Sequence, residues 1–154
     1  MLKFYNYDIV FQEIPDEVTL AFNITHCPHR CHNCHSPFLW EDNGELFNEE
    51  NIEIILKNYK DAITCLSIMG GDNDTKEVNR MAAWLKKTYG LKIGWYSGNK
   101  ELSQDIELKN FDYVKLGPYI EELGGLKQKT TNQKLYKILP GGLKEDITFR
   151  FWKT

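Results

Sequence analysis

A chain of 154 residues has the usual length of one domain, and at this length about 68 to 70 % of the unfolded surface is buried on folding. The composition, 42 % hydrophobic and 27 % charged, is that of a globular protein, and the net charge of -3 provides no basic surface for nucleic acid. The N-terminal residues contain neither an apolar signal nor a twin-arginine pair, and no stretch is long enough to span a membrane. We therefore expect one cytoplasmic domain, residues 1–154, that binds neither nucleic acid nor a membrane.

The first predicted strand leads into a cysteine-rich loop. Residues 18–24 are rich in β-branched and aromatic side chains, and Cys27, Cys31 and Cys34 follow with the spacing CxxxCxxC. Thiolates select iron-sulfur clusters, zinc or cuprous copper, and a four-iron cluster ordinarily takes four cysteines. If the fourth cysteine, Cys65, stays away from this loop, such a cluster has one iron without a protein ligand, open to a small molecule.

A closed zinc site is the alternative interpretation of the same loop. All four histidines of the chain lie there, at positions 26, 29, 32 and 35. Three cysteines and one histidine form a common structural zinc site, so Cys27, Cys31, Cys34 and His35 would define a zinc-binding interaction module. A disulfide framework is not expected, because cysteines are few and nothing indicates export.

Helices and strands alternate after the loop. Asn48 is a candidate N-cap, and Ile52, Ile55, Leu56 and Tyr59 follow with helical spacing. The further elements predicted in chain order are a buried strand over 63–69, a helix from Asp74 or Thr75 to about residue 90, a strand over 91–97, a short helix over 101–107 and a strand over 111–116. Residues 119–140 are predicted to be irregular, and residues 147–152 to form a last strand.

This alternation favours right-handed crossovers and a parallel sheet, either open and doubly wound or part of a β/α barrel. In both cases ligands bind at the C-terminal ends of the strands. Four segments follow strands and would share that edge: the cysteine loop, Gly70-Gly71-Asp72, Ser97-Gly98-Asn99 and Gly117-Pro118. The sequence therefore predicts an active site there.

The order of these motifs resembles the radical S-adenosylmethionine superfamily and, within it, the activating proteins of anaerobic ribonucleoside-triphosphate reductases. The segments that carry the resemblance are Cys27 to Cys34, Met69-Gly-Gly-Asp72, Trp95-Tyr-Ser-Gly98, and Gly117-Pro-Tyr119 with Thr130-Thr-Asn-Gln133. They cover most of the chain, and together they favour the iron-sulfur interpretation over zinc. We accordingly expect an α/β fold that is an incomplete TIM-like β/α barrel with mostly parallel strands, open on one side to admit a loop of a partner protein.

The resemblance implies a radical chemistry. Cys27, Cys31 and Cys34 would bind three irons of a 4Fe-4S cluster, and S-adenosyl-L-methionine would chelate the fourth through its amino and carboxylate groups. One electron, from a donor such as flavodoxin or ferredoxin, would cleave the sulfonium to methionine and a 5'-deoxyadenosyl radical. That radical would take a hydrogen atom from a glycine of anaerobic ribonucleoside-triphosphate reductase, or, as the alternative, of another glycyl-radical enzyme or a peptide. No protein residue beyond the cluster and cofactor is expected to be catalytic.

The resemblance also implies a set of cofactor-binding residues. Asn33 and His35 would contact the adenosine, and Gly70 and Gly71 would run beside the methionine amino group because their backbone approaches closely without a Cβ. The full expected set is Asn33, Cys34, His35, Gly70, Gly71, Asp72, Tyr96 and Ser97. Tyr96, Ser97 and Asn99 would line the ribose pocket, and the alternative for these residues is an ordinary strand end and turn.

Several residues have a structural alternative beside the functional one. Asp72 either serves the cofactor site or is the N-cap of the next helix. Lys115 either reaches a cofactor carboxylate or the partner, or is a solvated lysine, and Asn132 and Gln133 either bind partner or cofactor or lie in an exposed loop. Cys65, inside an apolar strand, is expected to be a core residue.

Overall fold

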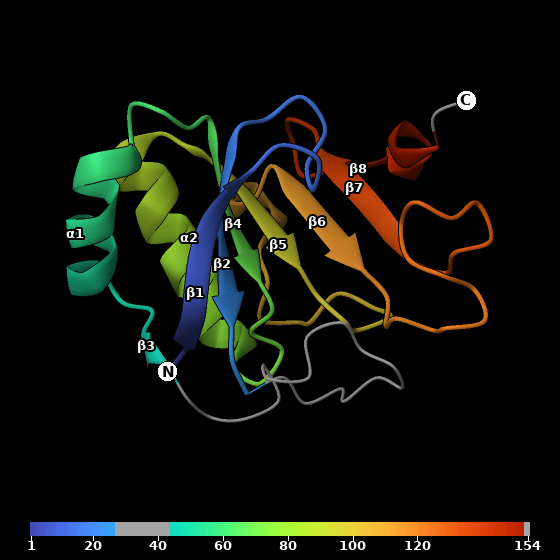
Figure 1. The fold of residues 1–154 in the computed structure, drawn as a ribbon, viewed down its shortest axis with the longest axis horizontal. Helices are drawn as coiled ribbons and strands as arrows, with labels where there is room; N and C mark the ends of the chain where they lie inside the picture. Colours follow the sequence, from blue (N-terminus) through green and yellow to red (C-terminus); the bar gives the residue numbers. More distant parts are fainter. Residues whose placement is uncertain (27–43, 153–154) are drawn as a thin grey trace.

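The computed structural model describes residues 1–26 and 44–152, which form one eight-stranded sheet and two α-helices (Figure 1). The strands are β1 Lys3–Val10, β2 Thr19–Ile24, β3 Glu45–Leu46, β4 Cys65–Met69, β5 Lys92–Tyr96, β6 Tyr113–Leu116, β7 Lys134–Ile138 and β8 Lys144–Asp146. Their order in the sheet is β3-β1-β2-β4-β5-β6-β7-β8. The helices are α1 Glu49–Tyr59 and α2 Thr75–Tyr89, with short 3-10 helices at Leu108–Asn110 and Thr148–Phe151.

The expected incomplete TIM-like β/α barrel with mostly parallel strands is wrong. Three neighbouring pairs among β2, β4, β5 and β6 are parallel, but four pairs toward the two edges, involving β1, β3, β7 and β8, are antiparallel. β1 and β8, which lie outside the parallel centre of the sheet, are largely exposed. Such exposure is common for antiparallel strands with one solvated face. The structure is therefore a mixed sheet with a parallel centre.

The two α-helices begin where the sequence predicts. The side chain of Asn48 accepts a hydrogen bond from the amide of Asn51 at 3.0 Å at the start of α1. The Asp74 side chain accepts one from Glu77 at the start of α2, which ends at Gly90 in the left-handed conformation, with φ +66°. Each cap satisfies backbone groups that a helix end leaves without an internal partner.

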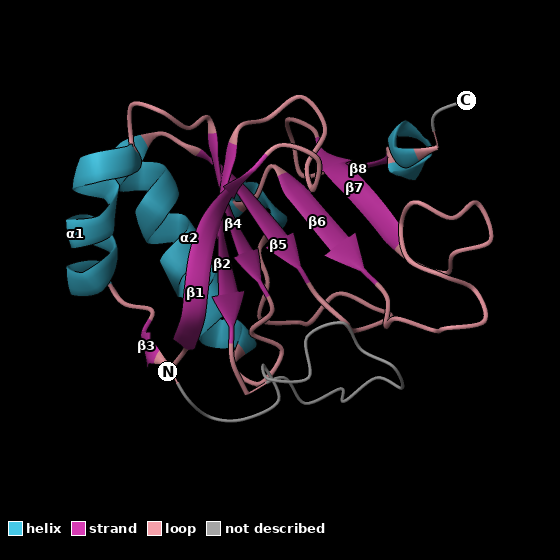
Figure 2. Cartoon of the chain, viewed as in Figure 1, coloured by secondary structure: helices cyan, strands magenta, loops and turns pink. Residues whose placement is uncertain are grey.

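Both helices pack on the same face of the sheet (Figure 2). Their buried side chains include Ile52, Leu56, Met81 and Leu85, which join Phe22, Ile68 and Trp95 of the strands in one hydrophobic core. A smaller cluster, which includes Ile14, Cys65, Tyr113 and Leu135, forms a second core. No helix among the described residues is long and apolar enough to cross a membrane.

Three predicted segments differ from the structure. Residues 101–107 form turns instead of a helix, and there the hydroxyl of Ser103 accepts a hydrogen bond from the amide of Asp105 at 3.2 Å, a local contact that competes with helix formation. Residues 119–140, predicted to be irregular, contain β7. The predicted strand over 147–152 is instead a 3-10 helix, because Asp146 accepts hydrogen bonds from both the amide and the hydroxyl of Thr148 and turns the chain.

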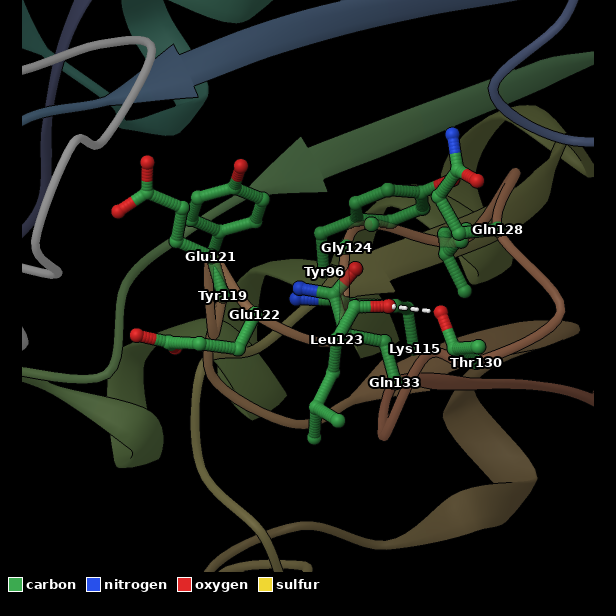
Figure 3. A pocket seen from close by; sticks show the side chains of 12 residues that line it. Tyr96, Lys115, Tyr119, Glu121, Glu122, Leu123, Gly124, Gln128, Thr130 and Gln133 are labelled. Atoms are coloured by element: carbon green, nitrogen blue, oxygen red, sulfur yellow. Dashed lines mark hydrogen bonds between the residues drawn. The ribbon is translucent and has the colours of Figure 1, made fainter.

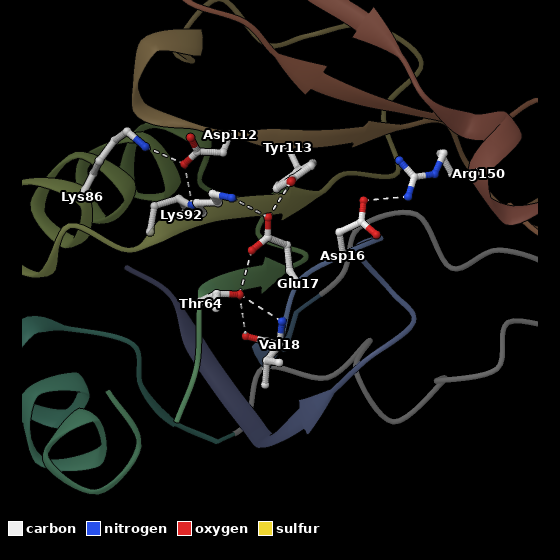
Figure 4. Close-up of polar contacts among 10 residues, drawn as sticks. Asp16, Glu17, Val18, Thr64, Lys86, Lys92, Asp112, Tyr113 and Arg150 are labelled. Atoms are coloured by element: carbon white, nitrogen blue, oxygen red, sulfur yellow. Dashed lines mark hydrogen bonds and ion pairs between the residues drawn. The ribbon is translucent and has the colours of Figure 1, made fainter. Parts of the chain in front are cut away.

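A buried carboxylate joins the strands at their N-terminal ends (Figure 4). Glu17, which is 5 % exposed, accepts hydrogen bonds from the Tyr113 hydroxyl at 2.6 Å, the Thr64 hydroxyl at 2.7 Å and the Lys92 ammonium at 2.9 Å. Burial alone would raise the pKa of Glu17, but these hydrogen bonds and the charge of Lys92 outweigh it, so the pKa lies below its ordinary value. The network stabilises the sheet at the N-terminal ends of the parallel strands, which is the end opposite to the predicted site.

This network predicts a specific acid sensitivity. Because the folded-state pKa of Glu17 is lowered, its contribution to stability is complete above the ordinary pKa of 4.5 and is lost as the pH falls through the lower folded value. We expect Glu17→Gln to lower the free energy of unfolding at pH 7 by about 2 kcal/mol, and to show less loss of stability than the wild type on further acidification. Urea titrations at a series of pH values measure both. The control is Glu145→Gln, which alters an exposed residue of β8; equal pH curves for Glu17→Gln and the wild type would contradict the assignment.

Candidate functional site

The C-terminal ends of the four parallel strands lie side by side, as predicted. Asn23, Met69, Tyr96 and Lys115 pair in one row across β2, β4, β5 and β6. Three of the four expected segments, those beginning at residues 70, 97 and 117, therefore start at the same edge, and the stem of the cysteine loop, up to His26, leaves from this edge as well. The predicted ligands Cys27, Cys31 and Cys34, with Asn33 and His35, lie outside the described residues.

Gly70 and Gly71 are required by the packing of the protein itself. Both have positive φ, +119° and +99°. A Cβ on Gly70 would lie 3.3 Å from the Cβ of Ile24, and one on Gly71 would lie 2.6 Å from Val78 Cγ2. The carbonyl of Gly70 accepts a hydrogen bond from the Trp95 indole at 2.7 Å, and that of Gly71 from the Asp74 amide at 3.0 Å. The packing of the protein therefore explains why both positions are glycine, in addition to the close approach of a cofactor that the resemblance implies.

Asp72 connects two of the loops. Its Oδ1 accepts a hydrogen bond from the Ser97 hydroxyl at 2.6 Å, and its Oδ2 accepts one from the Gly98 amide at 2.7 Å. The Asn99 side-chain amide approaches Oδ1 at 3.4 Å. The N-cap of α2 is Asp74, so the interpretation of Asp72 as that cap is wrong.

Tyr96 and Lys115 are neighbours on β5 and β6. The Lys115 ammonium lies 5.8 Å from the centre of the Tyr96 ring and donates hydrogen bonds to the carbonyls of Ser97, at 3.1 Å, and Gly117, at 2.8 Å. Lys115 is only 8 % exposed, so the interpretation as a solvated lysine is wrong. The Tyr96 hydroxyl donates to the carbonyl of Glu13, and its burial, with the nearby Glu13 carboxylate, raises its pKa, so the phenol stays protonated at neutral pH.

A pocket of about 710 Å³ opens beside this pair (Figure 3). Tyr96, Lys115 and Gln133 line it together with residues of the segment 119–130, in which Thr130 donates a hydrogen bond to the Leu123 carbonyl at 2.7 Å. Figure 3 shows the carboxylates of Glu121 and Glu122 on the side of Tyr119, with Gln128 on the opposite side. The sequence did not predict this wall, because its residues carry no hydrophobic periodicity; the glycine pair 124–125 was the available signal.

Asn132 and Gln133 hold the adjoining loop in place. The Asn132 side-chain amide donates to the Pro118 carbonyl at 3.1 Å, and that of Gln133 approaches the Gly117 carbonyl at 3.4 Å. Gln133 is 7 % exposed. The interpretation of these two residues as part of an exposed loop is therefore wrong.

The fourth cysteine, Cys65, lies on β4 at the end away from the stem of the cysteine loop. Cys65 is fully buried, and burial raises the pKa of its thiol to about 12, so it stays protonated. It pairs with Thr19 at the start of β2, and Ile24 at the end of that strand is five residue steps away, about 16 Å at 3.3 Å per residue. Outside residues 27–43 the described chain has no group of three histidine, cysteine or acidic side chains placed to hold a metal. The cysteine loop is thus the candidate centre, and its thiolates are the ligands that iron-sulfur clusters take.

Comparison with known protein families gives one match. Residues 18–139 match the family described as 4Fe-4S single cluster domain, a region that begins just before β2 and ends just after β7. It includes the cysteine loop and all four parallel strands. Comparisons with curated proteins and with solved structures gave no match.

Proposed function

We infer the function of this chain from its family: the chain belongs to the 4Fe-4S single cluster domain family. Membership favours an iron-sulfur cluster over the closed zinc site that the cysteine loop also allowed. The observation that carries the proposal is the position of Cys65, which lies at the end of β4 opposite to the point where β2 leads into the cysteine loop. A four-iron cluster on Cys27, Cys31 and Cys34 would then have one iron without a cysteine ligand, whereas an ordinary four-iron cluster takes four cysteines.

We propose that the protein is a radical S-adenosylmethionine enzyme that activates anaerobic ribonucleoside-triphosphate reductase. When bound, the cluster and S-adenosyl-L-methionine supply the one-electron cleavage of the sulfonium, and flavodoxin or ferredoxin supplies the electron. The support comes from the three cysteines and from the three described loops that meet at one edge of the sheet. The protein's contribution to such chemistry is orientation and exclusion of water.

The described residues suit those tasks. The buried ammonium of Lys115 holds the carbonyls of Ser97 and Gly117, which fixes the loops after β5 and β6 relative to each other. Its positive charge, beside the Tyr96 ring, also suits the carboxylate of a bound amino acid. The pocket beside these two residues has a volume of about 710 Å³, which is within the usual range of ligand pockets, and we assign the glycine-bearing segment of the partner to it.

The test starts from protein reconstituted without oxygen. Reduced protein is mixed with S-adenosyl-L-methionine and an anaerobic ribonucleoside-triphosphate reductase, and 5'-deoxyadenosine is assayed alongside electron paramagnetic resonance. We expect a glycyl doublet and an equivalent amount of 5'-deoxyadenosine. Deoxyadenosine without the doublet would contradict the partner and favour another glycyl-radical enzyme or a peptide. Stoichiometric zinc without sulfide would overturn the proposal altogether.

A further inference from the structure

The loops after β4 and β5 are joined beyond the point where the strands end. Backbone pairing of the strands ends at Met69 and Tyr96, and the Gly70 amide adds a hydrogen bond to the Tyr96 carbonyl at 2.9 Å. Beyond this point the Asp72 carboxylate, in the loop after β4, accepts hydrogen bonds from the loop after β5. The donors are the Ser97 hydroxyl at 2.6 Å and the Gly98 amide at 2.7 Å. We call the contact of Asp72 with Ser97 and Gly98 the loop clasp.

The loop clasp depends on a carboxylate in this place. An ionised carboxylate only accepts hydrogen bonds, and two donors reach its two different oxygens. Ser97 is fully buried, and its hydroxyl oxygen also accepts the Asn99 amide at 3.0 Å, so the hydroxyl proton is directed to Asp72. The Ser97 hydroxyl therefore forms its hydrogen bonds within the protein. This role is different from the direct contact with a ribose that the resemblance implies.

We propose that Asp72 is a positioning residue: through the loop clasp it sets the separation of the loops at residues 70–72 and 97–99, so that the cofactor site has its shape before S-adenosyl-L-methionine arrives. The inference rests on the proposed function, because these two loops are the ones assigned to the cofactor. Asp72 acts through Ser97 and the Gly98 backbone. A site held in its bound shape loses less conformational freedom on binding and therefore binds more tightly.

The first test follows the clasp itself, without any cofactor. Hydrogen exchange of the Gly98 amide is measured by nuclear magnetic resonance on the wild type, Asp72→Ala, the size-matched Asp72→Asn and the control Asp61→Asn, which removes an exposed carboxylate elsewhere. We expect the amide to be protected in the wild type and the control, and to exchange at least about tenfold faster in Asp72→Ala. A wild-type Gly98 amide that becomes protected only when cofactor is added would overturn the proposal.

The second test separates positioning from direct contact. Dissociation constants for S-adenosyl-L-methionine are measured on cluster-loaded wild type, Asp72→Ala, Ser97→Ala and the double variant, with thermal unfolding recorded for each. We expect Asp72→Ala to weaken binding about tenfold and Ser97→Ala to weaken it by less, because the Gly98 amide can still donate to Asp72 in that variant. The double change should bind no more weakly than Asp72→Ala, because Ser97 acts only through Asp72. Unchanged affinity in Ser97→Ala, or effects that add in the double variant, would overturn the proposal while leaving the function intact. A wild type that binds no cofactor would overturn the proposed function, and with it this role of Asp72.

Discussion

Cys34→Ala is expected to lose the iron-sulfur cluster and all formation of 5'-deoxyadenosine, while the protein still folds. The reason is that the two hydrophobic cores and the seven strand pairs of the described structure are formed by residues outside the cysteine loop. Removing a cluster ligand should therefore change chemistry far more than stability. Iron and sulfide content, the deoxyadenosine yield and a denaturant titration measure the three quantities.

Cys65→Ala is the matched control, because it removes a thiol at the N-terminal end of β4, away from the candidate site. Cys65 is fully buried, so we expect a loss of about 1 to 2 kcal/mol in the free energy of unfolding, with iron content and cleavage unchanged. The two cysteine variants should thus show opposite patterns. Undiminished deoxyadenosine from Cys34→Ala, or loss of iron from Cys65→Ala, would refute the ligand assignment.

Gly71→Ala is expected to lower the free energy of unfolding by about 3 to 4 kcal/mol, because the new Cβ meets two obstacles. The residue has φ +99°, a conformation that side chains rarely adopt, and the Cβ would lie 2.6 Å from Val78 Cγ2. Val78 is fully buried on α2 and belongs to the main hydrophobic core. Denaturant unfolding measures the loss, and we expect weaker cofactor binding as well, since Asp72 is the next residue.

Gly90→Ala separates the two causes. Gly90 ends α2 with φ +66°, but a Cβ there would meet nothing within 4 Å, so only the backbone conformation is penalised. We expect a cost of about 1 kcal/mol. Adding Val78→Ala to Gly71→Ala should recover the part due to the clash. Equal costs for the two glycine variants would show that the contact with Val78 does not matter.

The helices and the parallel centre of the sheet were predictable because their signals are local. The side chains of Asn48 and Asp74 cap helix ends within a few residues of themselves, and the spacing of Ile52 and Leu56 marks the buried face of α1. Gly90 and the apolar run before Gly70 are equally local. Such patterns depend on the period of one element and not on what that element touches.

The edges of the sheet were not predictable in the same way. β1 and β8 are largely exposed and carry little of the apolar alternation that marks a strand. Their positions in the sheet depend on antiparallel backbone pairing with β2 and β7. The alternating elements allowed either an open sheet or a partial barrel, and the resemblance favoured the barrel, whereas the antiparallel strands at both sides make the sheet mixed.

The sequence by itself determined which cofactor chemistry is available to this chain. It places three thiolates in one short loop, assigns residues 18–139 to a family, and marks both α-helices and the four parallel strands. Ligand type and local periodicity are properties of neighbouring residues. Only the tertiary structure decided that Cys65 lies at the far end of β4, that Lys115 is buried, and that Asp72 binds the next loop instead of capping its own helix. Those outcomes depend on which strands become neighbours and in which register, and residues 72 and 97 meet only once β4 and β5 have paired.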